Sequence, residues 1–226
     1  LWLGGTNSIT RMDLAQGKER SWTTADGLAP GLMETPAAGK NGDVWFVANG
    51  RGVSRIDAKG RVRSWQTAEQ GIAVADFEQI EVAPDGAVWL ADALGLRILD
   101  ASSEVFHSLP DGPQARVSTF LLLPDQSVWT AGVDGLAHWA IEKNRLRRLQ
   151  TIGAAEGLPA AEYFSMQVDQ NGLLWVAGAR GLWRIALDPL KVELVDSRLG
   201  LPRLQYATRP MMRLIDERIV VPATEG

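Results

Sequence analysis

The sequence of 226 residues contains no cysteine and only two histidines, His107 and His138. The absence of cysteine excludes disulfide scaffolds, thiolate metal sites and thiol nucleophiles. The motifs HExxH and GxSxG and phosphate-binding glycine loops are also missing. We therefore expect no cofactor and no metal site, and we expect each histidine to be a surface or packed side chain. The sequence does not exclude a pair of carboxylates for acid–base catalysis, because acidic loops from distant segments can converge.

The sequence also has no excess of basic residues and no long apolar run. The net charge is −4, which argues against a nucleic-acid partner because phosphate contacts need a lysine- and arginine-rich surface. We interpret the densest basic stretch, residues 143–148, as a solvated strand edge. No segment approaches the roughly 18 apolar residues of a membrane-spanning helix. The chain shows no signal peptide and begins inside a repeated motif. We expect it to be part of a longer protein, attached to a membrane only through a tether outside this segment.

A phrase centred on tryptophan recurs along the chain. Its copies centre on Trp2, Trp45, Trp89, Trp129 and Trp175, and a sixth copy has Val220 at the tryptophan position. Successive copies are 43, 44, 40, 46 and 45 residues apart. A period of this size indicates one supersecondary unit repeated along the chain. The predicted repeats lie near residues 1–30, 31–73, 74–113, 114–159 and 160–202, with a partial repeat at 203–226, and together they form one array over residues 1–226.

Each repeat has the pattern of four short strands. In the fifth copy, the apolar run 164–168 is followed by a turn at 169–172 and a second apolar run at 173–177. An Asn-Gly or Asp-Gly pair between two such runs is a strong hairpin signal. Two more strands are predicted at 182–185 and 192–195. The unit is therefore a four-stranded antiparallel sheet.

The second strand of this unit is apolar on both faces rather than alternating. Such a strand needs a layer above it and a layer below it. Four-stranded sheets stacked by repetition predict an all-β fold, the β-propeller. Helical repeats are excluded because no stretch shows sustained 3.6-residue spacing. Five periods can close a five-bladed ring with one strand spare, or form most of a seven-bladed ring; we favour the seven-bladed ring. The tryptophans that recur in register, and the pair Trp22 and Trp65, are expected in the core.

A fuller consensus joins the repeats: a Gly-Leu-Pro segment, the tryptophan strand, and an Arg-Ile-Asp segment. Examples are 157–159, 200–202 and, less completely, 27–30 for the first part, and 55–57 for the last. This consensus resembles the two-component regulator propeller repeat over essentially the whole chain. The resemblance implies a bacterial, periplasmic sensor domain that precedes a membrane helix and a kinase or diguanylate cyclase, and that acts as a homodimer. The sequence departs from the consensus at 110–113 and at Val220.

Candidate binding residues lie in the loops. In a four-stranded blade, the turn between strands two and three shares one end with the connection to the next blade, and loops on a rigid scaffold often carry binding groups. The predicted ligand-binding residues at this end are Asn7, Asn49, Arg51, Asp92, Asp134, Arg180 and Glu225. The connections add Asp26, Glu69, Asp111, Glu156 and Arg198. Carboxylates, amides and guanidinium groups around one mouth suit a small polar ligand such as an oligosaccharide. The alternative is that they are solvated turn residues.

Three functions remain open. The first is a non-catalytic sensing module that binds a ligand or partner at the loop end. The second is an enzyme, because residues 44–47 with 54–60 are also similar to streptogramin lyases, and that resemblance implies a histidine, acidic residues and magnesium. This chain has no histidine in a matching loop. The third is a passive docking scaffold.

Overall fold

The structure is a computed structural model that describes residues 1–49, 51–72, 77–143, 145–196, 206, 210–214 and 216–223. Contacts divide the chain into two compact units, residues 1–109 with 113–115 and residues 110–112 with 116–226. The described regular structure consists of β-strands and short 3-10 turns. Among these described residues, no helix is long and apolar enough to span a membrane.

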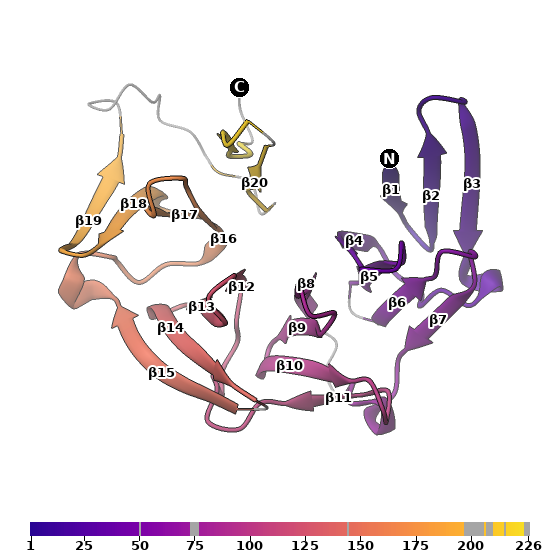
Figure 1. Cartoon of the computed structure of the whole chain (residues 1–226), viewed down its shortest axis with the longest axis horizontal. Helices are drawn as coiled ribbons and strands as arrows, with labels where there is room; N and C mark the ends of the chain where they lie inside the picture. Colours follow the sequence, from indigo (N-terminus) through magenta and orange to yellow (C-terminus); the bar gives the residue numbers. More distant parts are fainter. Residues whose placement is uncertain are drawn as a thin grey trace. The chain divides into compact units, whose positions relative to one another are not determined.

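The first unit contains three antiparallel sheets whose strands neighbour one another in chain order (Figure 1). The first sheet has three strands, β1 (Trp2–Gly5), β2 (Ser8–Asp13) and β3 (Lys18–Thr23). The second consists of β4 (Met33–Ala38), β5 (Val44–Ala48), β6 (Gly52–Ile56) and β7 (Val62–Trp65). The third consists of β8 (Phe77–Val82), β9 (Val88–Asp92), β10 (Gly95–Asp100) and β11 (Val105–Ser108).

The second unit repeats the same topology. One sheet consists of β12 (Thr119–Leu123), β13 (Ser127–Gly132), β14 (Gly135–Glu142) and β15 (Arg145–Ile152). The next consists of β16 (Tyr163–Val168), β17 (Leu174–Gly178), β18 (Gly181–Leu187) and β19 (Leu190–Val195). A two-stranded sheet follows, with β20 (Met212–Arg213) and β21 (Ile219–Val220). The prediction of an all-β fold built from four-stranded antiparallel sheets is confirmed.

The hairpins between first and second strands form where the sequence predicts them. Gly42 and Gly172 have positive φ angles of 76° and 77°, and Gln126 adopts 62° where the repeat has lost its glycine. Glycine takes this left-handed backbone without a steric penalty, which explains the recurring Asn-Gly pair. Each hairpin therefore fixes the register of the tryptophan strand that follows it.

The second strands form the core, as their sequence predicts. Every residue of β5 is buried, and Trp129 on β13 is fully inaccessible. Trp129 belongs to a buried cluster that also contains Leu174 and Val176 from β17 and Trp183 from β18. Side chains of consecutive sheets thus meet face to face within the unit, and a second strand such as β5 is buried on both faces.

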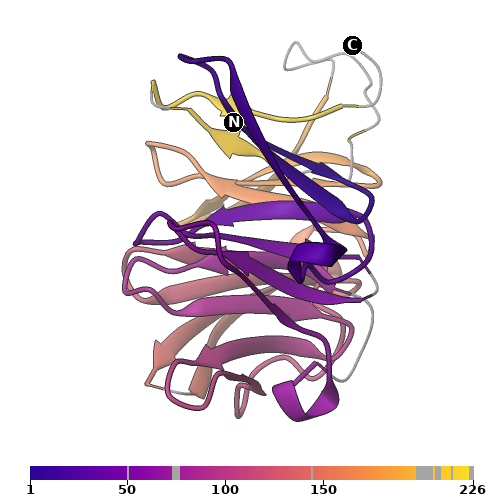
Figure 2. The same ribbon diagram turned by 90° about the vertical axis from the view of Figure 1, so that its right-hand side faces the viewer.

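A single 3-10 turn precedes several of the connections between sheets. The turns are η1 (Thr24–Asp26), η2 (Ala68–Gln70) and η3 (Ala154–Glu156), and η1 and η2 are visible as short coils in Figure 2. Each ends at a glycine in the left-handed region, with φ of 101° at Gly27 and 80° at Gly71. In η1 and η3 this is the glycine of the Gly-Leu motif, and in η2 it precedes Ile72, so the glycine stops the turn and directs the chain into the next sheet.

Two tryptophans, each on the last strand of its sheet, connect consecutive sheets in the first unit. Trp22 on β3 donates from Nε1 to the carbonyl oxygen of Gly60 at 2.9 Å. Trp65 on β7 donates in the same way to the carbonyl oxygen of Glu104 at 2.8 Å. Both acceptors lie in the turn between the third and fourth strands of the following sheet. The predicted burial of this tryptophan pair is confirmed, with 3% and 1% exposure.

We predict that Trp65→Phe lowers the free energy of unfolding by about 1–3 kcal/mol more than Trp129→Phe. Both substitutions shrink a fully buried ring. Trp65 also loses its hydrogen bond, whereas Nε1 of Trp129 is buried without a partner among the described residues. Urea denaturation of both variants measures the difference. Equal losses would mean that the Trp65 hydrogen bond contributes nothing to stability.

Candidate functional site

Most of the predicted ligand-binding residues lie in the turns between second and third strands. They differ in their contacts and in their exposure. Asn7, with a φ angle of 57°, occupies the β1–β2 turn. Its side-chain Oδ1 accepts from the backbone N–H of Gly31 at 2.7 Å, and its own N–H donates to the Gly31 carbonyl at 2.7 Å. Asn7 therefore holds the connection that leads into β4, which is a structural role.

Asp92 also has a structural role. The residue is completely buried at the end of β9, and its carboxylate lies 2.5 Å from Nε of Arg97. It also accepts from the backbone N–H of Leu94 at 2.7 Å. A buried carboxylate is stable in this position only because the guanidinium and the turn N–H replace its hydration. Its oxygens are therefore committed to the fold.

Two of the four acidic residues predicted on the connections, Asp26 and Glu156, cap the 3-10 turns. Asp26 accepts from the backbone N–H of Thr23 at 2.8 Å, and Glu156 accepts from that of Gly153 at 2.7 Å. This is the capping arrangement in which an acidic side chain satisfies a free N–H at the start of a turn. Asp111 instead forms an exposed ion pair with Arg145 at 3.5 Å. The sequence signal Thr-x-x-Asp before Gly-Leu is thus a capping signal.

Four predicted residues remain exposed on turns. Asn49 and Arg51 flank the β5–β6 turn in the first unit. Asp134 and Arg180 occupy the β13–β14 and β17–β18 turns of consecutive sheets in the second unit. Arg180 is close enough to influence Tyr163: burial raises the pKa of that phenol to about 12, and the Arg180 charge opposes the rise. The predicted residues Glu225 and Arg198 lie outside the described residues.

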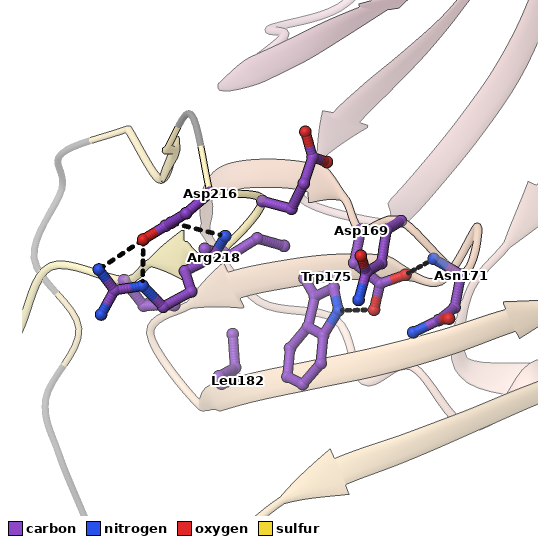
Figure 3. A pocket seen from close by; sticks show the side chains of 10 residues that line it. Asp169, Asn171, Trp175, Leu182, Asp216 and Arg218 are labelled. Carbon is purple, nitrogen blue, oxygen red and sulfur yellow. Dashed lines mark hydrogen bonds and ion pairs between the residues drawn. The ribbon is translucent and has the colours of Figure 1, made fainter.

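A groove of about 410 Å³ lies at the opposite end of the strands in the second unit, and the sequence did not single it out (Figure 3). We call it the hairpin-end groove. Its apolar floor consists of Trp175, Leu182, Ile219 and Val221, and its rims are the hairpin residues 169–171 and 216–218. Figure 3 shows Trp175 donating from its ring N–H to Asp169, at 2.9 Å, and Asp216 paired with Arg218. The worn tryptophan position at Val220 was the one sequence signal at this place.

His138 lies on β14, directly opposite Trp129 on β13, and the two rings stack with centroids 4.4 Å apart. Its Nε2 is 2.8 Å from Oγ of Ser127, and that hydroxyl donates to Asp125 at 2.6 Å. Because the serine proton is directed to the aspartate, the histidine donates to the serine. A hydrolytic triad has the histidine between serine and acid, so this order does not activate the serine.

The equivalent position in three other sheets is an arginine, the first being Arg11, which lies opposite Trp2. Arg55 lies opposite Trp45, and Arg184 lies opposite Trp175. Arg55 pairs with Asp43 at 2.7 Å and places its guanidinium 5.5 Å from the Trp45 ring centroid. His138 thus replaces a permanently charged side chain with one whose charge depends on pH. The expectation of a packed histidine is confirmed for His138.

Catalytic groupings are sparse in the described part of the chain. His107 is exposed on β11, with one long contact of 3.5 Å to Ser103. No group of three or more His, Asp or Glu side chains that could hold a metal ion occurs within the described residues.

No protein-family model and no curated protein matches this chain. Several solved structures are similar to this chain. The extracellular domain of the hybrid two-component system BT3049 from B. thetaiotaomicron aligns with 97% of this chain at a TM-score of 0.79 and 16% identity. That of the hybrid two-component system BT4673 aligns with 98% at 0.74 and 17%. The chain has the fold of two-component sensor ectodomains. It spans 30% of the length of each of these two ectodomain structures, and the resemblance inferred from the repeats is supported at the level of the fold.

Virginiamycin B lyase from Staphylococcus aureus is also similar in structure. It aligns with 96% of this chain and 71% of its own length, with a TM-score of 0.72 and 15% identity. A catalytically inactive histidine-to-alanine variant of this lyase, bound to quinupristin, aligns with 97% of this chain at 0.66. Both kinds of neighbour share the fold with this chain, so the fold alone does not distinguish sensor from enzyme.

We predict that Asp92→Ala destabilises the protein by about 3–5 kcal/mol, because it leaves the Arg97 guanidinium buried without its partner. Arg51→Ala, at an exposed turn, changes stability by about 0.5 kcal/mol or less. Chemical denaturation of the two variants gives both values. A small loss for Asp92→Ala would show that its carboxylate is not needed by the fold and is available to a ligand.

We predict that stability falls as the pH drops below about 6.5, the pKa of an unperturbed histidine. Burial lowers the pKa of His138, and the charge of Asp125 opposes this effect. The unfolded chain therefore binds the proton more readily, so the stabilisation is complete above the unfolded pKa and is lost as pH falls through the lowered folded pKa. The unfolding free energy measured between pH 7 and pH 5 tests this. His138→Gln removes the slope, and the matched control His107→Gln keeps it; an unchanged slope in His138→Gln contradicts the assignment.

Proposed function

We propose that this chain is an extracytoplasmic ligand-sensing module of a bacterial signal-transduction receptor and is not itself catalytic. The observation that carries the proposal is that 97–98% of this chain aligns with 30% of the extracellular domain structures of two hybrid two-component systems. The repeat consensus of the sequence, which resembles the regulator propeller repeat, supports the same function independently of the structural match. The scaffold suits this role, because buried strands hold exposed turns in fixed positions.

The ligand-binding residues in this proposal are exposed turn residues, considered separately within each unit. Asn49 and Arg51 stand on one turn of the first unit, and Asp134 and Arg180 stand on two turns of the second. A guanidinium group can hold a carboxylate or sulfate with two parallel hydrogen bonds, and amide and carboxylate groups bind hydroxyls. The chemistry favours a small polar ligand such as an oligosaccharide that carries acidic groups.

The wider setting is part of the same proposal. The module lies in the periplasm as the outer part of a membrane-anchored receptor, with its tether outside this segment. Its sheets belong to a seven-bladed ring, and the receptor acts as a homodimer. In such a receptor, a ligand changes signalling only if it binds one arrangement of the domains more tightly than another.

We predict that oligogalacturonate, an acidic oligosaccharide, raises the melting temperature of the protein, whereas a neutral galacto-oligosaccharide has a smaller effect. Binding stabilises the folded state by about 2.7 kcal/mol when the ligand is at a hundredfold excess over its Kd. Arg51→Ala and Arg180→Ala reduce the shift by weakening binding. Arg61→Ala is the control, because its side chain is equally exposed but lies on the β6–β7 turn at the other end of the strands. Equal shifts in all three variants would refute the site.

The alternative function is a lyase, which the structural similarity to virginiamycin B lyase supports. Incubation with quinupristin, followed by mass spectrometry, separates the two functions. An intact antibiotic after prolonged incubation with magnesium supports the sensor. Consumption of quinupristin that is abolished by His107→Ala or His138→Ala would establish the enzyme instead.

A further inference from the structure

The last strand of the sheet β16–β19 has one edge that faces away from the sheet (Figure 1). β19 pairs with β18 over six consecutive residue pairs without a bulge, and no strand pairs with its other edge among the described residues. This edge belongs to a complete four-stranded sheet, like those of β4–β7 and β12–β15. An edge of this kind presents N–H and C=O groups to another strand.

The register shows which backbone groups of β19 point outward. The loop between β18 and β19 has two residues, so its closing pair, Leu187 and Leu190, exchanges both backbone hydrogen bonds. Hydrogen-bonded and non-hydrogen-bonded positions then alternate along an antiparallel ladder. Lys191 and Glu193 therefore occupy non-hydrogen-bonded positions toward β18, and their N–H and C=O groups point away from the sheet.

The side chains of β19 have the same chemical pattern in both directions. Residues 190–194 read Leu-Lys-Val-Glu-Leu, with a charged residue on each side of the central Val192. When two copies of the strand pair antiparallel about Val192, Lys191 lies opposite Glu193 of the second copy. Leu190 then lies opposite Leu194 of the second copy. Opposite charges and apolar side chains that face each other across two strands stabilise the pair, so this strand is complementary to itself.

These side chains are available to a second copy. Leu190 is 39% exposed and Leu194 is 42% exposed. Glu193 lies 2.5 Å from Nζ of Lys191 and 2.7 Å from Arg184. Hydrogen bonds from Lys191 and Arg184 lower the pKa of Glu193 to about 2, so its carboxylate is charged at neutral pH. A second copy adds its own lysine and glutamate to this charged row in the opposite order.

The other outermost strands within the described residues lack this symmetry. β15 carries Arg145, Arg147 and Arg148, which would meet like charges in an antiparallel pair. The N–H of Leu146 on β15 already donates to the carbonyl oxygen of Pro110 at 3.2 Å, and a bulge interrupts the strand. β3 exposes no large apolar side chain, and β7 and β11 have only four residues each. Charges, bulges and short strands are the usual protection of a sheet edge.

We propose that two copies of this chain associate edge to edge through β19, with the strands antiparallel and centred on Val192. Each copy uses the same edge, so the contact closes as a dimer. Pro189 lacks an N–H and ends the pairing on the hairpin side. The inference deepens the homodimer of the proposed function, on which it rests, by naming the contact surface. The paired segment is short, so association is strong only where tethers hold two copies close together.

Disulfide trapping tests the contact, because the 226-residue chain has no cysteine of its own. Opposed residues at non-hydrogen-bonded positions have Cα atoms about 4.5 Å apart, which a disulfide can span. Val192→Cys is expected to form a covalent dimer on mild oxidation, because Val192 lies opposite itself. Leu190→Cys and Leu194→Cys are each expected to stay monomeric, because each lies roughly 13 Å from its own counterpart. An equal mixture of these two variants is expected to form a covalent dimer.

Non-reducing gel electrophoresis and mass spectrometry measure the dimer in each sample. The mixture decides the register, also if Val192→Cys does not fold, because both of its cysteines replace exposed leucines. No covalent dimer in the mixture would overturn the proposal. A dimer in Leu190→Cys alone, as abundant as that in the mixture, would also overturn it, because it would show unspecific oxidation.

A charge reversal tests the pairing across the edge. Lys191→Glu, added to both proteins of the mixture, places like charges opposite each other and is expected to slow cross-linking about fivefold. Lys59→Glu is the matched control, because it makes the same charge change at an exposed position of the first unit and leaves the rate unchanged. Equal rates for Lys191→Glu and Lys59→Glu contradict the pairing of charges.

The outcome is separable from that of the proposed function. The melting assay with oligogalacturonate measures ligand binding, whereas cross-linking measures association. The expected cross-linking without a melting shift would refute the ligand site and keep the dimer contact. A melting shift without cross-linking in the mixture would refute the dimer contact and keep the ligand site.

Discussion

The structure depends on the burial of the second strand of a four-stranded sheet on both of its faces, as in β5, β9 and β13. A strand such as β5, in which every residue is buried, is stable only when another sheet covers each face. This requirement makes the four-stranded sheet unable to stand alone, and it explains why the chain repeats the unit instead of elaborating it. It also explains the composition of the second strands, because large rings such as Trp129 fill the space between sheets and small residues such as Ala131 permit close approach.

The connections between sheets meet a second constraint, which is hydrogen bonding. A connection leaves the regular ladder, so its backbone groups need partners from outside the sheet. Here they come from side chains: Asp26 and Glu156 cap the 3-10 turns, Asn7 binds Gly31, and Ser54 accepts from the N–H of Ala29 at 2.9 Å. Several polar residues at one end of the strands thus bind backbone groups of the connections. The remaining exposed residues, such as Arg51 and Arg180, form a smaller set that is available to a ligand.

Most of the fold could be predicted from the sequence, whereas the site could not. The tryptophan spacing and the Asn-Gly turns predicted the strands, their order and their pairing, because the hairpin and the double-sided apolar run are local signals. The structural partners of Asp92 and Asn7, which are Arg97 and Gly31, could not be predicted, because they are recognisable only once the turns are built. The hairpin-end groove could not be predicted for a related reason. The sequence around Trp175 has the same pattern as that around the other repeated tryptophans, and its partial exposure depends on what packs against it.

The tryptophan bonds of the first unit run in one direction along the chain. Trp22 and Trp65 each donate to a carbonyl in the sheet that follows, and Phe106 takes the same position in the next sheet without a donor. A cut between β7 and β8 therefore has unequal effects on the two fragments. Both fragments uncover apolar side chains of the shared cluster, such as Trp65 upstream and Phe77 downstream. The hydrogen bond itself leaves an indole N–H on the upstream fragment and a backbone carbonyl on the downstream fragment. The boundary between these two sheets is therefore held by a side-chain donor on one sheet and a backbone acceptor on the other, in addition to the shared apolar cluster.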